Sequence, residues 1–316
     1  MLVVSTTILT DEIQKQLKDE FKSVEFRFFE NIEAARESLA EADILVTFGS
    51  DVEEKYLQPA KRLKWMMVLS AGIDKIPTEL LKKRNIIVTN VKGIHKTPMA
   101  EYAISMLLNY CRSSLFFAER QKEREWDKSI QPRELAGSTL TVVGAGAIGE
   151  ELARLAQALG VKTIAVTNTG GQRPYFDQVY QNDELEVALK NADFVVSILP
   201  STEETKGYYQ REQFKWMKNS AVFLNMGRGN AVDEETLISA LNQGDIDHAI
   251  LDVTPIEPLP KESLLWSHEK VTITPHISGN SKQYVPRAME IFKENLASFI
   301  ENGDVLVNKI NLDRGY

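Results

Sequence analysis

The sequence predicts an α/β protein made of two units, each a parallel sheet with helices on both faces. Short runs of β-branched and aromatic residues alternate with helix-compatible segments, a pattern typical of strands joined by helical crossovers. The runs are apolar throughout, as expected of strands covered on both faces. They form two series: Leu2–Ser5, Glu25–Phe29, Ile44–Phe48, Trp65–Leu69 and Ile86–Thr89, then Thr139–Val143, Thr163–Thr167, Phe194–Leu199, Ala221–Asn225, Ala249–Val253 and Val271–Thr274.

Length and composition fit this class and narrow the range of partners. A chain of 316 residues is long enough for two domains, each with its own core. With 37 basic and 45 acidic residues the net charge is −8, which argues against nucleic acid or an anionic membrane as a partner. The single cysteine, Cys111, can form neither an intramolecular disulfide nor a thiolate metal site. We expect a cytoplasmic protein without a signal peptide, a membrane span or a metal.

The helical segments suggest where the units divide. Thr97–Arg112 carries apolar residues on nearly every face, which predicts a helix buried on all sides between the two units. The next stretch, Glu119–Lys128, reads as a charged helix around Trp126. Lys282–Asn302 predicts a long amphipathic helix that could return to the first unit. We therefore expect a discontinuous first domain of residues 1–92 and 280–316, and a second domain of residues 93–279.

A glycine turn links the strand Thr139–Val143 directly to a helix predicted over Glu150–Leu159. Gly144 permits the tight turn, Gly146 lets the backbone approach a pyrophosphate, and Gly149 allows the helix to pack closely on the strand. The N–H groups and the positive dipole end of the helix then face the anion. The turn predicts a Rossmann-type dinucleotide site, with a purely structural turn as the alternative.

The following strand indicates which dinucleotide is preferred. An acidic residue about 20 positions after the glycines would bind the adenosine ribose and repel a 2′-phosphate. No Asp or Glu lies between Glu151 and Asp177. Hydroxyls, an amide and a guanidinium stand there, and these groups suit a phosphate: Thr167, Asn168, Thr169 and Arg173. We expect NADP(H) to be preferred over NAD(H), with Arg173 as a merely solvated residue being the alternative.

Three candidate catalytic residues follow predicted strands, at the edge where parallel sheets bind ligands: Arg228, Glu257 and His276. Arg228 lies between two glycines, which would keep neighbouring side chains away from its planar fork and favour a clamp on a carboxylate or carbonyl. Glu257 lies between two prolines in a stiff loop. Taken singly, the three could be a solvated charge, a surface turn and a structural histidine.

Together, the motifs resemble those of the D-isomer-specific 2-hydroxyacid dehydrogenase family, which includes glyoxylate/hydroxypyruvate reductases and phosphoglycerate dehydrogenases. The resemblance implies two Rossmann-like domains separated by a cleft, with a flavodoxin-like substrate domain first, and a homodimer to which an exposed Trp126 would contribute. It covers nearly the whole chain: Ser70-Ala71-Gly72-Ile73-Asp74, Met99-Ala100-Glu101, the glycine turn, Leu199-Pro200 with Thr205, Asn225 with Arg228-Gly229, Asp252 with Glu257-Pro258, and Pro275-His276-Ile277.

The resemblance also implies residue roles. Arg228, Glu257 and His276 would form the catalytic set, and Asp252 would hold the nicotinamide carboxamide. The implied substrate-binding residues are Ser70, Ala71, Gly72, Arg228 and His276. The expected cofactor contacts are Gly144, Gly146, Ala147, Ile148, Gly149, Thr167, Asn168, Thr169, Arg173, Leu199, Pro200, Thr205, Met226, Gly227, Arg228, Asp252, His276 and Ser278.

The chemistry of keto acid reduction agrees with these roles. Hydride transfer to C2 builds charge on the carbonyl oxygen, so a proton donor must stand beside it; His276 can be that donor, with Glu257 on its far ring nitrogen. Arg228 would polarise the carbonyl. We therefore predict an NADPH-dependent reductase of 2-keto acids, leaving open which acid it takes. The alternatives are a non-enzymatic dinucleotide-sensing regulator on the same fold and, more remotely, formate or phosphite oxidation.

The other histidines carry weaker signals. His95 precedes the helix between the units, where it would touch substrate or cofactor or else lie on the surface of a hinge. His248 and His268 are expected to be structural or solvated.

Overall fold

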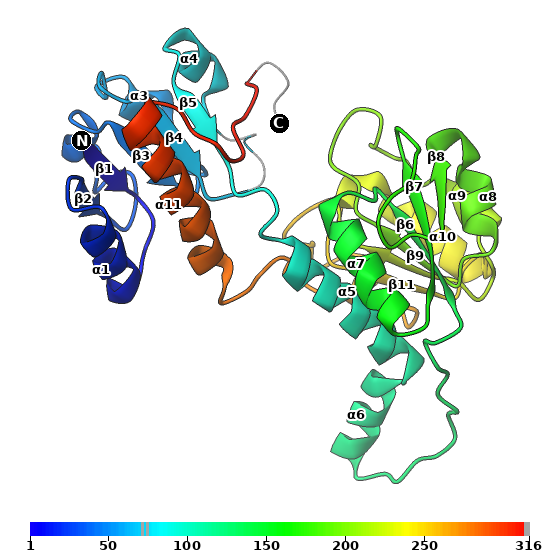
Figure 1. Ribbon diagram of the computed structural model, residues 1–316. Helices are drawn as coiled ribbons and strands as arrows, with labels where there is room; N and C mark the ends of the chain where they lie inside the picture. Colours follow the sequence, from blue (N-terminus) through cyan, green and yellow to red (C-terminus); the bar gives the residue numbers. More distant parts are fainter. Residues whose placement is uncertain (71–72, 74–75, 313–316) are drawn as a thin grey trace. The chain divides into compact units, whose positions relative to one another are not determined.

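The computed structural model describes residues 1–70, 73 and 76–312, and its contacts divide the chain into two compact units (Figure 1). The first comprises Met1–Ile94 and Ser281–Tyr316, and the second comprises His95–Asn280. Each contains one sheet whose neighbouring strands are parallel, with five strands in the first unit and seven in the second. The predicted fold class, two parallel α/β units, is confirmed. None of the described helices is long and apolar enough to span a membrane.

The sheet of the first unit has the strand order β2-β1-β3-β4-β5. All five strands were predicted, with ends that agree within one residue: β1 (Leu2–Ser5), β2 (Glu25–Phe28), β3 (Ile44–Thr47), β4 (Trp65–Val68) and β5 (Ile87–Thr89). The helices between them are α1 (Asp11–Glu20), α2 (Arg36–Leu39), α3 (Glu54–Leu57) and α4 (Thr78–Lys83). A run of buried side chains such as that of β3 is what helical cover on both faces requires.

The helix α11 (Tyr284–Asn302), drawn in red and orange in Figure 1, packs against this first sheet. Its Phe292 and Phe299 rings each lie 5.5 Å from the ring of Trp65. The fully buried Asn295 accepts hydrogen bonds from the backbone N–H groups of residues 306 and 307. The C-terminal segment is therefore part of the first unit's core.

The sheet of the second unit has the order β12-β11-β10-β9-β6-β7-β8. Its strands are β6 (Thr139–Val143), β7 (Lys162–Thr167), β8 (Gln178–Gln181), β9 (Phe194–Ser197), β10 (Val222–Asn225), β11 (His248–Leu251) and β12 (Val271–Ile273). Sequence patterning missed β8. This strand lies at the sheet edge with half-exposed or exposed residues, so it lacks the apolar run that marks a covered strand.

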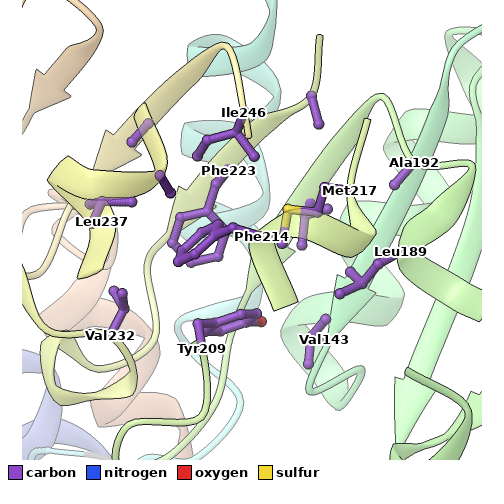
Figure 2. Packing of buried hydrophobic residues seen from close by; sticks show 14 of the residues in the cluster. Val143, Leu189, Ala192, Tyr209, Phe214, Met217, Phe223, Val232, Leu237 and Ile246 are labelled. Carbon is purple, nitrogen blue, oxygen red and sulfur yellow. The ribbon is translucent and has the colours of Figure 1, made fainter. Parts of the chain in front are cut away.

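Helices cover both faces of this second sheet. On one face α8 (Leu185–Lys190), α9 (Arg211–Trp216) and α10 (Glu234–Gln243) bury an aromatic core (Figure 2). Phe223 packs edge-on against Tyr209 and Phe214, at ring distances of 4.8 and 5.4 Å. On the other face lie α5 (Lys96–Cys111) and α7 (Ala147–Ala158). Three short 3-10 turns complete the unit, at Asn182–Glu184, Gly229–Ala231 and Leu264–Ser267.

Two helix predictions were wrong. The helix α5 is buried along one stripe only, at Ala100, Ala103, Leu107 and Cys111, because α7 and the sheet cover it from one side. The charged helix expected around Trp126 is instead α6 (Ser114–Glu123), which ends at Arg124 in a left-handed conformation.

Beyond that helix end, Trp126 is 91% exposed. The carbonyl of Cys111 accepts a hydrogen bond from the N–H of Arg133 at 2.9 Å, so the chain returns to the point that it left. We call residues 112–132 the arm.

Candidate active site

The candidate site residues of the second unit follow neighbouring strands of one parallel sheet. Because all of these strands run in the same direction, their carboxyl ends meet at one edge. The glycine turn follows β6, Leu199 follows β9, Arg228 follows β10, Glu257 follows β11 and His276 follows β12. This is the edge at which open α/β sheets bind ligands.

The glycine turn has the geometry of a phosphate-binding loop. Gly144 has a φ of 89°, and a Cβ there would lie 2.8 Å from the carbonyl oxygen of Ile198. A Cβ on Gly149 would lie 3.0 Å from Val142. At Gly146, by contrast, a Cβ would meet no described atom within 4 Å, so open space remains at the N-terminus of the twelve-residue helix α7. The turn therefore fits a pyrophosphate, with free first-turn N–H groups beside it.

The loop after β7 holds the residues predicted for a 2′-phosphate. The Thr167 hydroxyl accepts the N–H of Gly170, and Arg173 reaches the hydroxyl of Thr169 at 3.4 Å. Arg173 also lies 3.6 Å from Glu150, an acid that its position close to the glycines did not mark as a partner of this loop. Glu150 lies in the first turn of α7, the helix that precedes β7 in the chain.

The loop after β7 also contacts Asn182 and borders a surface hollow. Asn168 accepts a hydrogen bond from the side chain of Asn182 at 2.6 Å. Residues 171–174 and 176–179 line a surface hollow of about 700 Å³.

Glu257 and His276 are in direct contact. The Nδ1 atom of His276 lies 2.7 Å from Oε2 of Glu257, and Oε1 of Glu257 accepts the N–H of Thr254 at 3.1 Å. The imidazole is 52% and the carboxylate side chain 38% exposed, so both are open to a ligand. The contact leaves Nε2 as the ring nitrogen for an incoming group.

Arg228 is exposed and lies in a loop fixed by Asn225. The Asn225 amide donates to the carbonyl of Arg228 at 3.0 Å, and its oxygen accepts the N–H of Gly227 at 3.2 Å. A Cβ on Gly227 would lie 2.6 Å from the backbone N of Leu199, and one on Gly229 would lie 2.0 Å from a backbone oxygen. The glycines therefore permit close backbone approach. This close approach is a reason for both glycines beyond the expected one, that they keep side chains away from the Arg228 guanidinium.

Asp252 is buried, with 1% exposure, and holds the segment that carries His276. Its carboxylate accepts hydrogen bonds from the Thr274 hydroxyl at 2.7 Å and from the N–H groups of Ile277 and Ser278 at 2.9 and 3.0 Å. Sequence analysis missed Thr274. Leu251 pairs with Ile273 in the sheet, so the next residues of the two strands, Asp252 and Thr274, are neighbours; neither strand's own sequence reveals this register.

His95 lies against the same segment. A Cβ on Gly279 would lie 2.9 Å from Cδ2 of the His95 ring. Burial, and after it the positive charge of Arg228, lowers the pKa of His95. The structure thus places the His95 ring beside the segment that carries His276, and its contact with substrate or cofactor stays a prediction.

The remaining predicted residues occupy defined places. Leu199 and Pro200 follow β9, and the Thr205 hydroxyl donates to the carbonyl of Pro200 at 2.6 Å. Met226 is buried directly after β10. Ser70 follows β4 in the first unit, whereas Ala71 and Gly72 lie outside the described residues. Within residues 1–70, 73 and 76–312, no three His, Cys, Asp or Glu side chains gather as metal ligands would.

Comparison with known proteins identifies the family. Residues 104–278 match the model of the D-isomer specific 2-hydroxyacid dehydrogenase NAD-binding domain. The chain is 32% identical to the glyoxylate/hydroxypyruvate reductase B of Klebsiella pneumoniae, over 98% of both proteins. It is 30% identical to a glyoxylate reductase of Korarchaeum cryptofilum, over 87% of this chain and 84% of the relative.

Solved structures agree. A D-isomer specific 2-hydroxyacid dehydrogenase family protein of Aeromonas salmonicida is 35% identical, with a TM-score of 0.86 over 99% of this chain and 98% of that one. A probable 2-hydroxyacid dehydrogenase of Rhizobium etli, solved with NADP, is 26% identical, with a TM-score of 0.78 over 100% and 99% of the two chains. The chain therefore belongs to the D-isomer specific 2-hydroxyacid dehydrogenase family, as an NAD(P)-dependent oxidoreductase that transfers hydride between a nicotinamide cofactor and C2 of a 2-hydroxy acid.

Proposed function

We propose that this protein reduces small 2-keto acids to D-2-hydroxy acids, with NADPH as the preferred cofactor and His276 as the proton donor. The observation that carries the proposal is the 2.7 Å contact between Glu257 and His276 at the sheet edge that also bears the glycine turn. The bound nicotinamide supplies the hydride. Glyoxylate and hydroxypyruvate are the first substrates to try, because the Klebsiella and Korarchaeum relatives, at 32 and 30% identity, are named as reductases of these acids.

The proton comes from the imidazole. Glu257 fixes the ring through Nδ1 and balances its positive charge, so Nε2 can donate a proton to the substrate oxygen as that oxygen becomes negative. The Thr254 N–H in turn fixes the carboxylate. In the reverse direction the neutral ring accepts the proton from the hydroxyl group.

Arg228 stabilises the charge that develops on the same oxygen and pairs with the substrate carboxylate. Its guanidinium is always charged and offers several donors in one plane, which suits a 2-keto acid with its adjacent carbonyl and carboxylate. Ser70, Ala71 and Gly72 remain predicted substrate-binding residues, on the family resemblance.

The cofactor assignment rests on the loop after β7. Arg173 and the Thr167 and Thr169 hydroxyls are the proposed partners of the 2′-phosphate, while the glycine turn takes the pyrophosphate and Asp252 the carboxamide. A 2′-phosphate would also compete with Glu150 for Arg173, since the two side chains are 3.6 Å apart.

We also propose a cytoplasmic homodimer. The arm exposes Leu115, Trp126 and Ile130 by 58, 91 and 37%. A second hollow, of about 580 Å³, lies between α5 and α7 and has a largely apolar lining that includes Leu108 and Leu155. A second copy of the chain would cover such surfaces. The only cysteine of the sequence, Cys111, is a buried free thiol, in keeping with a reducing compartment.

The test is the oxidation of NADPH and NADH with glyoxylate, hydroxypyruvate, pyruvate and larger 2-keto acids. We expect turnover with at least one acid and a higher kcat/KM for NADPH. Arg173→Gln should raise the KM for NADPH about 10-fold, the worth of one charge-assisted hydrogen bond, and leave the KM for NADH unchanged.

A matched control is Arg154→Gln, because Arg154 also pairs with an acid of α7, at 2.7 Å, but lies outside the loop after β7. A strong preference for NADH would contradict the cofactor assignment. Dinucleotide binding without turnover of any acid would contradict the reductase and favour a sensor.

A further inference from the structure

The hydroxyl of Tyr102 is connected to the candidate active site through two hydrogen bonds. Tyr102 belongs to α5, and its oxygen lies 2.7 Å from the hydroxyl oxygen of Thr274. The Thr274 hydroxyl lies 2.7 Å from Oδ1 of Asp252. The three side chains therefore form a relay from a half-buried tyrosine to a buried carboxylate.

Elementary chemistry fixes the direction of these bonds. An ionised carboxylate only accepts, so the Thr274 proton must point to Asp252, and the Thr274 oxygen is left to accept from Tyr102. Burial chiefly raises the pKa of Tyr102 to about 12; the hydrogen bond with Thr274 opposes this rise and the charge of Asp252 adds to it. The phenol thus keeps its proton at neutral pH and can donate it to Thr274.

The relay ends on the backbone that carries His276. Asp252 accepts the N–H groups of Ile277 and Ser278, and the N–H of His276 itself donates to the Asp252 carbonyl at 2.8 Å. His276 has a φ of 53°, a left-handed conformation that few non-glycine residues adopt. The hydrogen bonds to Asp252 flank this residue and hold its backbone in place.

The helix α5 contacts this segment at a second point. His95, directly before α5, lies seven residues or two helical turns from Tyr102 and therefore on the same face. Its ring packs against Gly279, while Tyr102 reaches Thr274. One helix face thus meets both ends of the segment Thr274–Gly279.

We propose that Tyr102 is a positioning residue, which acts through Thr274 and Asp252 to hold His276 in the orientation needed for proton donation. The inference rests on the proposed role of His276. Tyr102 itself is not proposed to touch a reacting atom. Without the Tyr102 hydroxyl, the Thr274 oxygen loses its hydrogen-bond donor, and the Thr274 side chain can rotate to a different partner. The carboxylate of Asp252 and the backbone that this carboxylate holds then become less fixed.

The test compares the steady-state kinetics of single and double variants. Tyr102→Phe should lower kcat about 10-fold, because small displacements of a catalytic group are costly, while the KM for the keto acid changes less than about 2-fold. Thr274→Val should cause a similar loss. The double variant should be no worse than either single variant, since both break one relay. Thr274→Ser, which keeps the hydroxyl, should restore most of kcat.

Tyr110→Phe is the matched control. Tyr110 also belongs to α5 and its hydroxyl donates to a carboxylate, that of Asp247, but Asp247 precedes β11 and lies at the opposite edge of the sheet. This variant should lower the Tm without lowering kcat. If Tyr102→Phe keeps the parent kcat, or if the losses of Tyr102→Phe and Thr274→Val add up, the positioning role is refuted.

The same experiment separates this inference from the proposed function. Full activity of the His276→Ala variant would show that His276 is not the proton donor. The inference about Tyr102 would then fail as well. An inactive His276→Ala beside a fully active Tyr102→Phe would overturn the positioning role alone.

Discussion

Gly229 and Gly146 differ in the space that a side chain would find, although both lie in loops at the same edge of the sheet. A Cβ on Gly229 would lie 2.0 Å from the carbonyl oxygen of Thr254, which no side-chain movement relieves. A Cβ on Gly146 would meet no described atom, and the φ of −86° at Gly146 suits alanine. The first glycine serves folding, and we assign the second to ligand approach.

Alanine at the two positions should separate these roles. Gly229→Ala should lower the free energy of unfolding by about 3 kcal/mol, the upper range for overpacking. Gly146→Ala should change it by less than about 0.5 kcal/mol. It should also add about 1.4 kcal/mol of steric cost at the pyrophosphate, which weakens NADPH binding about 10-fold. Urea unfolding and fluorescence titration measure both quantities. A stable Gly229→Ala, or full NADPH affinity in Gly146→Ala, would contradict the respective role.

For single residues, the sequence predicted which side chains are candidates for the site better than it predicted which of them touch. Glu257 and His276 lie 19 positions apart, and their pairing followed only from the family resemblance. Nothing in the sequence marked Tyr102, because a tyrosine in an apolar helix looks like any core aromatic. Its function depends on which hydroxyl stands across from it, and that is decided by strand register rather than by local pattern.

Among the elements, β11 and α5 meet around an uncharged histidine. The Nε2 atom of His248 in β11 lies 2.9 Å from the hydroxyl of Thr272 in β12, and the ring lies 5.2 Å from that of Tyr110 in α5. Burial lowers the pKa of His248 to about 4, although the carboxylate of Asp247 opposes this. The contact between β11 and α5 therefore requires the neutral form of the His248 ring.

This contact predicts a dependence of stability on pH. The unfolded chain protonates His248 near its ordinary pKa of 6.5 and the folded chain only near 4, so between these values the unfolded state holds more protons. Stability is therefore full above pH 6.5 and is lost as the pH falls toward 4, on the order of 2 kcal/mol by pH 5. Urea unfolding at pH 7.5 and pH 5 measures this loss. His248→Gln should reduce the loss, and an unchanged loss in that variant would assign it to other groups.

Strands were predictable because covered parallel strands are apolar without interruption, as in β3 and β10. The edge strand β8 was not predicted, because its residues are exposed or half-buried and form no apolar run. The start of α10 carries a sequence signal, because Asp233 caps the helix by accepting the N–H of Thr236. The end of α6 carries none, because Arg124 adopts its left-handed conformation without a glycine to signal it.

For the whole molecule, the exposed apolar side chains of the arm are the strongest argument for self-association. Analytical ultracentrifugation should find a dimer at micromolar concentration. Trp126→Asp should weaken it at least about 10-fold, the effect of losing a buried aromatic anchor. Leu306→Asp is the control, because Leu306 is 71% exposed in the first unit. A monomeric parent protein, or equal weakening by both substitutions, would contradict an interface at the arm.

His276, held by Glu257, is the proposed proton donor in keto acid reduction. The most direct measurement is NADPH oxidation by His276→Ala with the best keto acid, beside NADPH binding by the same variant. We predict a kcat lower by about two to four orders of magnitude, the usual worth of general acid catalysis, with NADPH affinity retained. A variant that binds NADPH and turns over at a rate close to that of the parent protein would contradict the claim.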